Sequence, residues 1–376
     1  MSAVFRSLGA DLVRFACASA LVVLVAACGR PPEIIGIENR EVPVEAIADL
    51  DRHRVFMVTT REASSEVGAL YGPDRSADLG LASVDVTVPP THVVGELERP
   101  DRLPPDPRTE FAIVQPAAYA TDAAFVAAID RELAKRPRGK RTLLLFIHGY
   151  NTSTTDAILR LGQFVEDTGF EGVPVLFSWA SAARTPLYVY DLNSALVARS
   201  RIKDLTRLLG ATKNESVDVF AHSMGTFLTM EGLVDAQLSG TLGTQGVVET
   251  VILASPDIDI DLFRTQIAQL PRPFVERMYL LISQDDYALR LSRRIAGGVP
   301  RVGAADAAEL ENLGVTVIDL SEIDDTNAGS HSKFAGSPEV VQLIGAGLNG
   351  AGRFDEGMEL SLDQVFLGVP IRIFGD

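Results

Sequence analysis

The chain has 376 residues, of which 47% are hydrophobic and 22% are charged. This length and composition allow one large buried core and exclude a chain that is mainly disordered. The formal net charge of −16 argues against a nucleic-acid partner, because binding to phosphates needs clustered lysines and arginines.

The first 28 residues differ in character from the rest of the chain. Arg6 and Arg14 precede an apolar run at residues 15–27, which has the length of a signal-peptide core and is short for a membrane span. The run ends Val-Ala-Ala-Cys-Gly, which resembles the bacterial lipobox, whose cysteine is lipidated and begins the mature chain. We expect a signal peptide at residues 1–27 and a lipid on Cys28. An ordinary signal peptide or an uncleaved anchor, with Cys28 unmodified, is the alternative.

The lipid would hold the protein in the bacterial cell envelope, at the outer membrane or the periplasmic face. Residues 28–52 contain three prolines among mixed charges. This composition predicts a lipidated N-terminus followed by a linker with little fixed structure. A folded domain is then expected over residues 53–376.

The domain begins with segments that favour strands. Residues 55–59 are largely apolar, and apolar and polar residues alternate at 84–88, as expected for a half-buried antiparallel strand. A connector rich in proline precedes a short predicted strand at 111–114. A helix is predicted from about residue 122 to residue 135.

From residue 142 onward, apolar segments alternate with amphipathic ones. Uninterrupted apolar runs are typical of parallel strands that are covered on both faces. They predict strands at residues 143–147, 173–177, 217–220, 248–253, 278–282 and 315–320.

Helices are predicted between these strands, because apolar residues recur at intervals of three and four. The first predicted helix has Ile158, Leu161 and Val165 on one face and ends at Gly169. The second is a single longer helix that has Ala198, Ile202, Leu205 and Leu209 on one face before Gly210. Further helices are predicted to begin near Ser223, Asp259 and Asp286. The alternation predicts an α/β fold, with a doubly wound, mostly parallel sheet and N-terminal antiparallel strands. Ligands bind such sheets at the carboxyl ends of the strands, so functional residues are expected there.

A candidate nucleophile follows the strand at residues 217–220. The sequence Ala221-His222-Ser223-Met224-Gly225 lies between that strand and a helix, which is the arrangement of a nucleophile elbow. Small residues are needed on both sides of the serine, because strand and helix pack closely around a strained turn. Alanine stands in place of the first glycine of G-x-S-x-G and is the smallest departure from it.

A serine hydroxyl needs a base to remove its proton, and the chain has five histidines. His331 is the candidate base, because it follows the last strand in the loop Ser330-His331-Ser332. Two histidines lie before the parallel sheet, a third belongs to an early turn, and His222 adjoins the serine and should point away from it.

The acid that orients the histidine should lie between the serine and the histidine in the chain. Asp286 is the first candidate, because it follows the strand at residues 278–282. Asp285 is its neighbour and rival. Asp257 also follows a strand end and is a second alternative. Each aspartate could equally serve only to cap the next helix.

Two backbone N–H groups are expected to stabilise the oxyanion of a tetrahedral intermediate. Met224 supplies one, as the residue after the nucleophile. The turn His148-Gly149-Tyr150-Asn151 follows the strand at residues 143–147, so Tyr150 is the second candidate donor and Gly149 gives the backbone freedom. A plain tight turn, with Asn151 capping the next helix, is the alternative.

Motifs for cofactors and metals are missing from the sequence. It has no Cys and His cluster with zinc spacing, no phosphate loop, and no G-x-G-x-x-G at a strand-to-helix turn. We therefore expect neither a metal nor a cofactor.

The motifs together resemble a family of bacterial α/β-hydrolases of unknown function, grouped with esterases and lipases. The resemblance spans about Val55 to His331 and is carried by these segments: Thr59-Thr60-Arg61, Phe146-Ile147-His148-Gly149-Tyr150-Asn151-Thr152-Ser153, Phe177-Ser178-Trp179-Ala180-Ser181, Ala221-His222-Ser223-Met224-Gly225-Thr226, Pro256-Asp257-Ile258-Asp259, Asp285-Asp286-Tyr287-Ala288-Leu289 and Ser330-His331-Ser332. It implies an α/β-hydrolase fold and hydrolysis of carboxylic esters. It implies no particular natural substrate, and the chain after Gly350 lies outside it.

The sequence thus predicts an envelope esterase or lipase that acts on an acyl ester with a Ser-His-Asp triad, anchored to a membrane by a lipid. An acyltransferase or a thioesterase would use the same triad with another acceptor or leaving group. The alternative of a different class is a non-catalytic envelope lipoprotein that retains the fold.

Overall fold

The computed structural model describes residues 30–48, 50–244, 246–323, 330–350 and 371–375. The predicted signal peptide and Cys28 lie outside the described residues. None of the helices within these ranges is long and apolar enough to cross a membrane.

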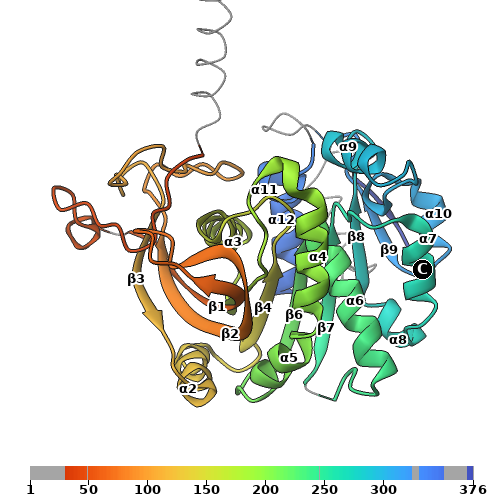
Figure 1. The fold of residues 1–376 in the computed structure, drawn as a ribbon, viewed down its shortest axis with the longest axis horizontal. Coiled ribbons are helices and arrows are strands. Elements are labelled where there is room, and N and C mark those ends of the chain that lie inside the picture. The colour runs from red at the N-terminus through yellow and green to blue at the C-terminus, as the bar shows by residue number, and fades with distance from the viewer. Residues whose placement is uncertain (1–29, 49, 245, 324–329, 351–370, 376) are drawn as a thin grey trace, which may run out of the picture.

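The described residues form a ten-stranded sheet (Figure 1). Its strands are β1 (Arg52–Ala63), β2 (Tyr71–Thr87), β3 (Ala112–Ala118), β4 (Thr142–Ile147), β5 (Val173–Ser178), β6 (Ser216–His222), β7 (Val248–Ala254), β8 (Met278–Ile282), β9 (Thr316–Asp319) and β10 (Arg372–Phe374). Their order in the sheet is β10-β9-β8-β7-β6-β4-β5-β1-β2-β3.

The sheet is mostly parallel. Every neighbouring pair from β1 and β5 across to β8 and β9 is parallel. The pairs of β1 with β2, β2 with β3 and β9 with β10 are antiparallel. The predicted fold class, a mostly parallel sheet with antiparallel N-terminal strands, is therefore confirmed.

Helices cover both faces of the sheet (Figure 1). They are α2 (Asp122–Leu133), α3 (Thr154–Thr168), α4 (Tyr188–Arg199), α5 (Ile202–Gly210), α6 (Met224–Leu238), α7 (Ile260–Ile267), α8 (Arg272–Val275), α9 (Tyr287–Ile295), α10 (Ala307–Glu311), α11 (Lys333–Gly336) and α12 (Pro338–Asn349), with short 3₁₀ helices η1 (Val44–Ala46), η2 (Thr185–Leu187) and η3 (Val302–Ala304). Apolar residues of α3, α11 and α12 form the core on one face, and those of α2, α4, α5, α6 and α7 form the core on the other.

One predicted helix differs from the structure. The segment expected to form a single helix from Ala198 to Leu209 is divided between α4 and α5, with Ser200 and Arg201 between them. Gly210 is the last residue of α5 and does not cap it. In contrast, Gly169 ends α3 with a φ of 60°, the left-handed conformation that glycine adopts without a steric penalty.

The N-terminal segment is more ordered than predicted. Ile34 and Ile35 are buried in the core between the sheet and α3. Ile35 N–H donates to the Gly68 carbonyl at 2.8 Å, and Gly36 N–H donates to the Ile113 carbonyl at 2.8 Å. The expectation of little fixed structure is therefore wrong for this part of the segment, because its two isoleucines complete the core beside β3.

Candidate active site

Ser223 occupies a strained turn between β6 and α6. Its φ is 53° and its ψ is −125°, and its side chain is buried. Such a positive φ is unfavourable for a residue with a Cβ and is typical of functional positions. The N–H of Ser223 donates to the Ala254 carbonyl at 2.9 Å, so β7 helps to hold the turn.

Close packing around the turn explains its small residues. A Cβ on Gly225 would lie 2.5 Å from the His148 carbonyl oxygen, so only glycine fits there. Ala221 belongs to β6 and is fully buried without such a conflict. The strand side of the elbow therefore accepts alanine, whereas the helix side requires glycine.

His331 and Asp286 are in direct contact. His331 Nδ1 lies 2.7 Å from Asp286 Oδ2, and the Asp286 side chain has no exposed surface. Asp286 Oδ1 accepts the Leu289 N–H at 2.9 Å and so caps α9. The two bonds fix the carboxylate, which in turn fixes the histidine ring. Among the described residues, no hydrogen bond joins His331 Nε2 to Ser223 or to another side chain.

The backbone of His331 is bound to the strand ends beside the nucleophile. Its carbonyl accepts from His222 Nε2 at 3.1 Å and from Ser255 Oγ at 3.2 Å. The rings of His222 and His331 are 4.8 Å apart. Burial and the nearby charge of His331 hold the pKa of His222 well below its ordinary value. His222 is therefore neutral and carries its proton on Nε2, which it donates to the His331 carbonyl. The loop of His331 is thus bound to the residue that precedes Ser223.

Asp257 is occupied elsewhere. It accepts hydrogen bonds from Ser292 Oγ and Tyr188 OH, and it pairs with Arg301 at 3.3 Å. These contacts join the end of β7 to α4 and α9. The carboxylate of Asp257 thus connects three parts of the fold, and no contact joins it to His331 among the described residues.

Asp285 binds the loop that carries His331. Its carboxylate accepts from Lys333 Nζ at 3.0 Å and from Ser330 Oγ at 2.7 Å. Lys333 is buried and also donates to the Leu320 carbonyl at 2.8 Å. Asp285 and Asp286 therefore hold the same loop, one through the residues flanking His331 and the other through its ring.

The candidate oxyanion turn lies directly against Ser223, the candidate nucleophile. A Cβ on Gly149 would be 2.8 Å from Ser223 Cβ, so glycine is needed here for close approach. Met224 is the first residue of α6, in the turn whose N–H groups have no partner within the helix. The N–H groups of Tyr150 and Met224 therefore come from two backbone segments that meet at Ser223.

Asp191 of α4 holds this turn in place. Its carboxylate accepts from the N–H of Asn151 at 3.1 Å, Ser181 Oγ at 2.6 Å and the N–H of Ala182 at 2.7 Å. Asn151 has a φ of 55°, which the bond to Asp191 helps to maintain. No local motif marked Asp191 in the sequence, because its partners lie 9 to 40 residues away.

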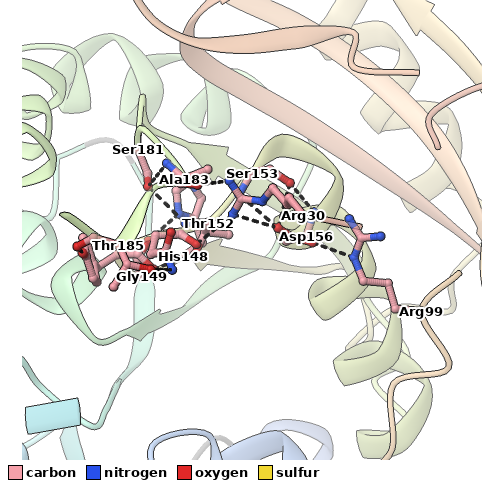
Figure 2. Close-up of polar contacts among 12 residues, drawn as sticks. Arg30, Arg99, His148, Gly149, Thr152, Ser153, Asp156, Ser181, Ala183 and Thr185 are labelled. Carbon is pink, nitrogen blue, oxygen red and sulfur yellow. Dashed lines mark hydrogen bonds and ion pairs between the residues drawn. The ribbon is translucent and has the colours of Figure 1, made fainter. Parts of the chain in front are cut away.

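Arg61 and His148 complete the support of the turn. Arg61 is buried and donates to Ser178 Oγ at 2.9 Å, the Ser181 carbonyl at 2.9 Å and the Thr152 carbonyl at 2.8 Å. Burial and the charge of Arg61 lower the pKa of His148 to about 3. Its ring stacks on Trp179. Its Nδ1 lies 2.9 Å from the Gly149 carbonyl (Figure 2). His148 is therefore a neutral part of the turn.

Metal ligands do not cluster in the part of the chain that the structure describes. No group of three or more His, Cys, Asp or Glu side chains there is arranged to hold a metal ion. Among the described residues, the pair of His331 and Asp286 is bound to His222, the residue that precedes Ser223.

A family model described as "Alpha/beta hydrolase of unknown function (DUF900)" matches residues 121–347. No curated protein matches the chain significantly. A "putative cell surface hydrolase" from Lactobacillus plantarum WCFS1 matches with 9% identity and a TM-score of 0.39, covering 60% of this chain and 98% of that one. A fungal esterase from Rhizomucor miehei matches with 11% identity and a TM-score of 0.34, covering 84% of each chain. Both scores are too low to bear on function.

Proposed function

Because the chain belongs to the family of α/β hydrolases of unknown function (DUF900), we propose that it is a serine hydrolase that cleaves carboxylic esters. The observation that carries the proposal is the contact of His331 with Asp286 at 2.7 Å, on a loop bound to the residue next to Ser223. A buried carboxylate on Nδ1 is the arrangement that makes Nε2 a base toward a serine hydroxyl.

The proposed reaction has two halves. Ser223 Oγ attacks the acyl carbon while His331 Nε2 takes its proton, and Asp286 stabilises the imidazolium that forms. The N–H groups of Tyr150 and Met224 donate to the oxyanion. His331 then gives the proton to the leaving alcohol, which departs from the acyl-enzyme. In the second half, water attacks the same carbon, His331 takes its proton, and the acid leaves as Ser223 recovers the proton.

A membrane anchor is the second part of the proposal. The lipobox-like sequence supports a lipid on Cys28 and a location in the bacterial cell envelope, where acyl esters of lipids are abundant. Mass spectrometry of the mature N-terminus tests this part, and an unmodified or uncleaved N-terminus would contradict it. The same triad would serve an acyltransferase or a thioesterase, and product analysis with added alcohol or thioester distinguishes them.

Labelling with a fluorophosphonate probe tests the activated serine. We expect the detergent-solubilised full chain to form an adduct on Ser223, located by mass spectrometry, and Ser223→Ala and His331→Ala to form none. Ser239→Ala is the control, because Ser239 is an exposed serine that follows the far end of α6, away from the candidate site. It should still be labelled on Ser223.

The result that contradicts the proposal is a folded wild-type chain without an adduct, or an adduct that persists in His331→Ala at the same rate. Either would favour a non-catalytic envelope protein on a hydrolase scaffold. Circular dichroism of each variant verifies that loss of labelling does not come from loss of folding.

A further inference from the structure

We propose that the carboxyl edge of the sheet, through helix α9, docks on the surface of an anionic bilayer, so that the site opens toward lipid esters in that bilayer. The proposal rests on the proposed function for its substrate class. The orientation of the protein on the bilayer is argued from the exposed surface of α9 and from the position of Arg30.

Helix α9 exposes an apolar stripe to solvent. Tyr287, Leu291 and Ile295 follow one another at intervals of four residues and therefore lie on one face of the helix. Their exposed fractions are 65%, 42% and 55%. The opposite face of the helix packs inward through Leu289 and Ser292. An apolar stripe on the outer face is the reverse of the usual pattern for a surface helix, and it indicates an apolar partner.

The same helix is basic in an acidic protein. Arg290, Arg293 and Arg294 are exposed, and none of them forms an ion pair with another described residue. The whole chain has a net charge of −16. Arginines flanking an apolar stripe are typical of helices that lie in the interface of a membrane with anionic lipids.

This stripe is continuous with the edge that carries the candidate active site. Helix α9 begins directly after Asp286, the residue that binds His331. Ser292 of α9 lies 3.1 Å from the hydroxyl of the buried Tyr188. The residues on either side of Tyr188, Leu187 and Val189, are apolar and exposed.

The first described residue, Arg30, is bound beside the candidate oxyanion turn (Figure 2). Arg30 donates to the carbonyl of Ala183 and, at 3.2 Å, to that of Asn151, and it pairs with Asp156 at 3.4 Å. Asn151 adjoins Tyr150, the candidate oxyanion donor. The chain at Arg30 therefore lies beside the candidate oxyanion turn.

This position makes any tether short. Cys28 precedes Arg30 by two residues. Two residues span at most about 7 Å, so a lipid on Cys28 would attach close to the oxyanion turn. Ile34 and Ile35 are buried, and they leave no long free segment between that lipid and the domain. The anchor and α9 would thus approach the bilayer from one edge of the molecule.

Quenching by brominated lipids tests the orientation in the full chain, purified with its own N-terminus. Leu291→Trp places an indole in the stripe. Leu238→Trp is the matched control, because Leu238 is 73% exposed at the far end of α6, which begins at the carboxyl edge with Met224. The chain has one tryptophan, Trp179, which is fully buried, so the wild-type chain supplies the background.

With vesicles of brominated phosphatidylcholine and phosphatidylglycerol, we expect strong quenching in L291W and none above background in L238W. Equal quenching in both variants, or none in L291W, would overturn the proposal. A blue-shifted L291W emission before vesicles are added would also overturn it, because another segment or a second copy would then cover the stripe.

The triple change Arg290→Gln, Arg293→Gln and Arg294→Gln in the L291W background tests the preference for anionic lipid. We expect weaker quenching on vesicles with phosphatidylglycerol and no change on phosphatidylcholine alone. Unchanged quenching on both kinds of vesicle would refute the proposed preference for anionic lipid. Hydrolysis of a soluble short-chain ester reports the proposed function separately, so its failure would leave the quenching result standing.

Discussion

Asp286 bonds to His331 and caps helix α9 with the two oxygens of one carboxylate. One oxygen lies 2.7 Å from His331 Nδ1, and the other accepts the Leu289 N–H at 2.9 Å. The helix with the exposed apolar stripe and the candidate base are therefore fixed by the same side chain. Helix capping and orientation of the base, which were competing roles for this aspartate in the sequence, coexist in the structure.

Asp286→Asn should separate the two roles. Asparagine caps helices about as well as aspartate, so the free energy of unfolding should change by less than about 1 kcal/mol. The amide cannot hold the same histidine tautomer or stabilise its charge, and kcat for a soluble ester should fall by about 10³ to 10⁴-fold. Steady-state kinetics and urea unfolding of the same preparation measure both. A variant with nearly full kcat would remove Asp286 from the proposed triad.

Asp257→Asn should show the opposite pattern. Asp257 pairs with Arg301 in a buried position, and breaking such a pair costs about 3 to 5 kcal/mol of stability. Where the variant remains folded, kcat should stay within about tenfold of wild type, because Asp257 does not touch the base. A large loss of kcat in a folded D257N sample would instead favour Asp257 as the acid.

Lys333→Met should loosen the loop of His331. The change removes the bonds of Lys333 to Asp285 and to the Leu320 carbonyl, and it leaves that carbonyl without a charged donor. We expect a loss of about 1 to 3 kcal/mol in stability and a lower kcat with little change in KM. Lys333→Arg, which keeps the charge, should recover part of kcat. A variant whose catalytic efficiency falls only because KM rises, with kcat unchanged, would contradict a positioning role for Lys333.

Gly225→Ala and Ala221→Gly should differ sharply. The new Cβ at residue 225 would meet the His148 carbonyl oxygen at 2.5 Å, so we expect loss of more than about 3 kcal/mol or failure to fold. Glycine at residue 221 adds no contact and should cost about 0.5 to 1 kcal/mol through chain entropy. Thermal unfolding of the two variants measures the contrast, and equal melting temperatures would be inconsistent with the packing described.

Asp218→Asn should stabilise the protein at neutral pH. Burial raises the pKa of Asp218 to about 7, and its Oδ1 has no hydrogen-bond partner among the described residues. The folded-state pKa lies above the unfolded one, so stability is complete below about pH 4 and falls as the pH rises to 7. The melting temperature of D218N should exceed that of wild type increasingly over this range. The corresponding gain in the free energy of unfolding is at most about 4 kcal/mol. A constant difference across pH would contradict the raised pKa.

Local patterns in the chain predicted most of the strands and the residues at their ends. Apolar runs identified β4 to β9. The elbow at Ser223 could be predicted because it lies between a strand pattern and a helix pattern, and the loop at His331 because it follows the last predicted strand. The division between α4 and α5 was not visible, since apolar residues at Ala198 and Leu205 keep the same helical spacing across the break.

Long-range contacts were decided only by the tertiary structure. Three aspartates followed strand ends in the sequence, and only folding brought Asp286 to His331, Asp285 to Lys333 and Asp257 to Arg301. Three partners of Arg61, Thr152, Ser178 and Ser181, lie 91 to 120 residues away and were equally invisible. Helical and strand periods report which face of an element is buried. Which side chains then meet depends on the order of strands in the sheet, which no local pattern encodes.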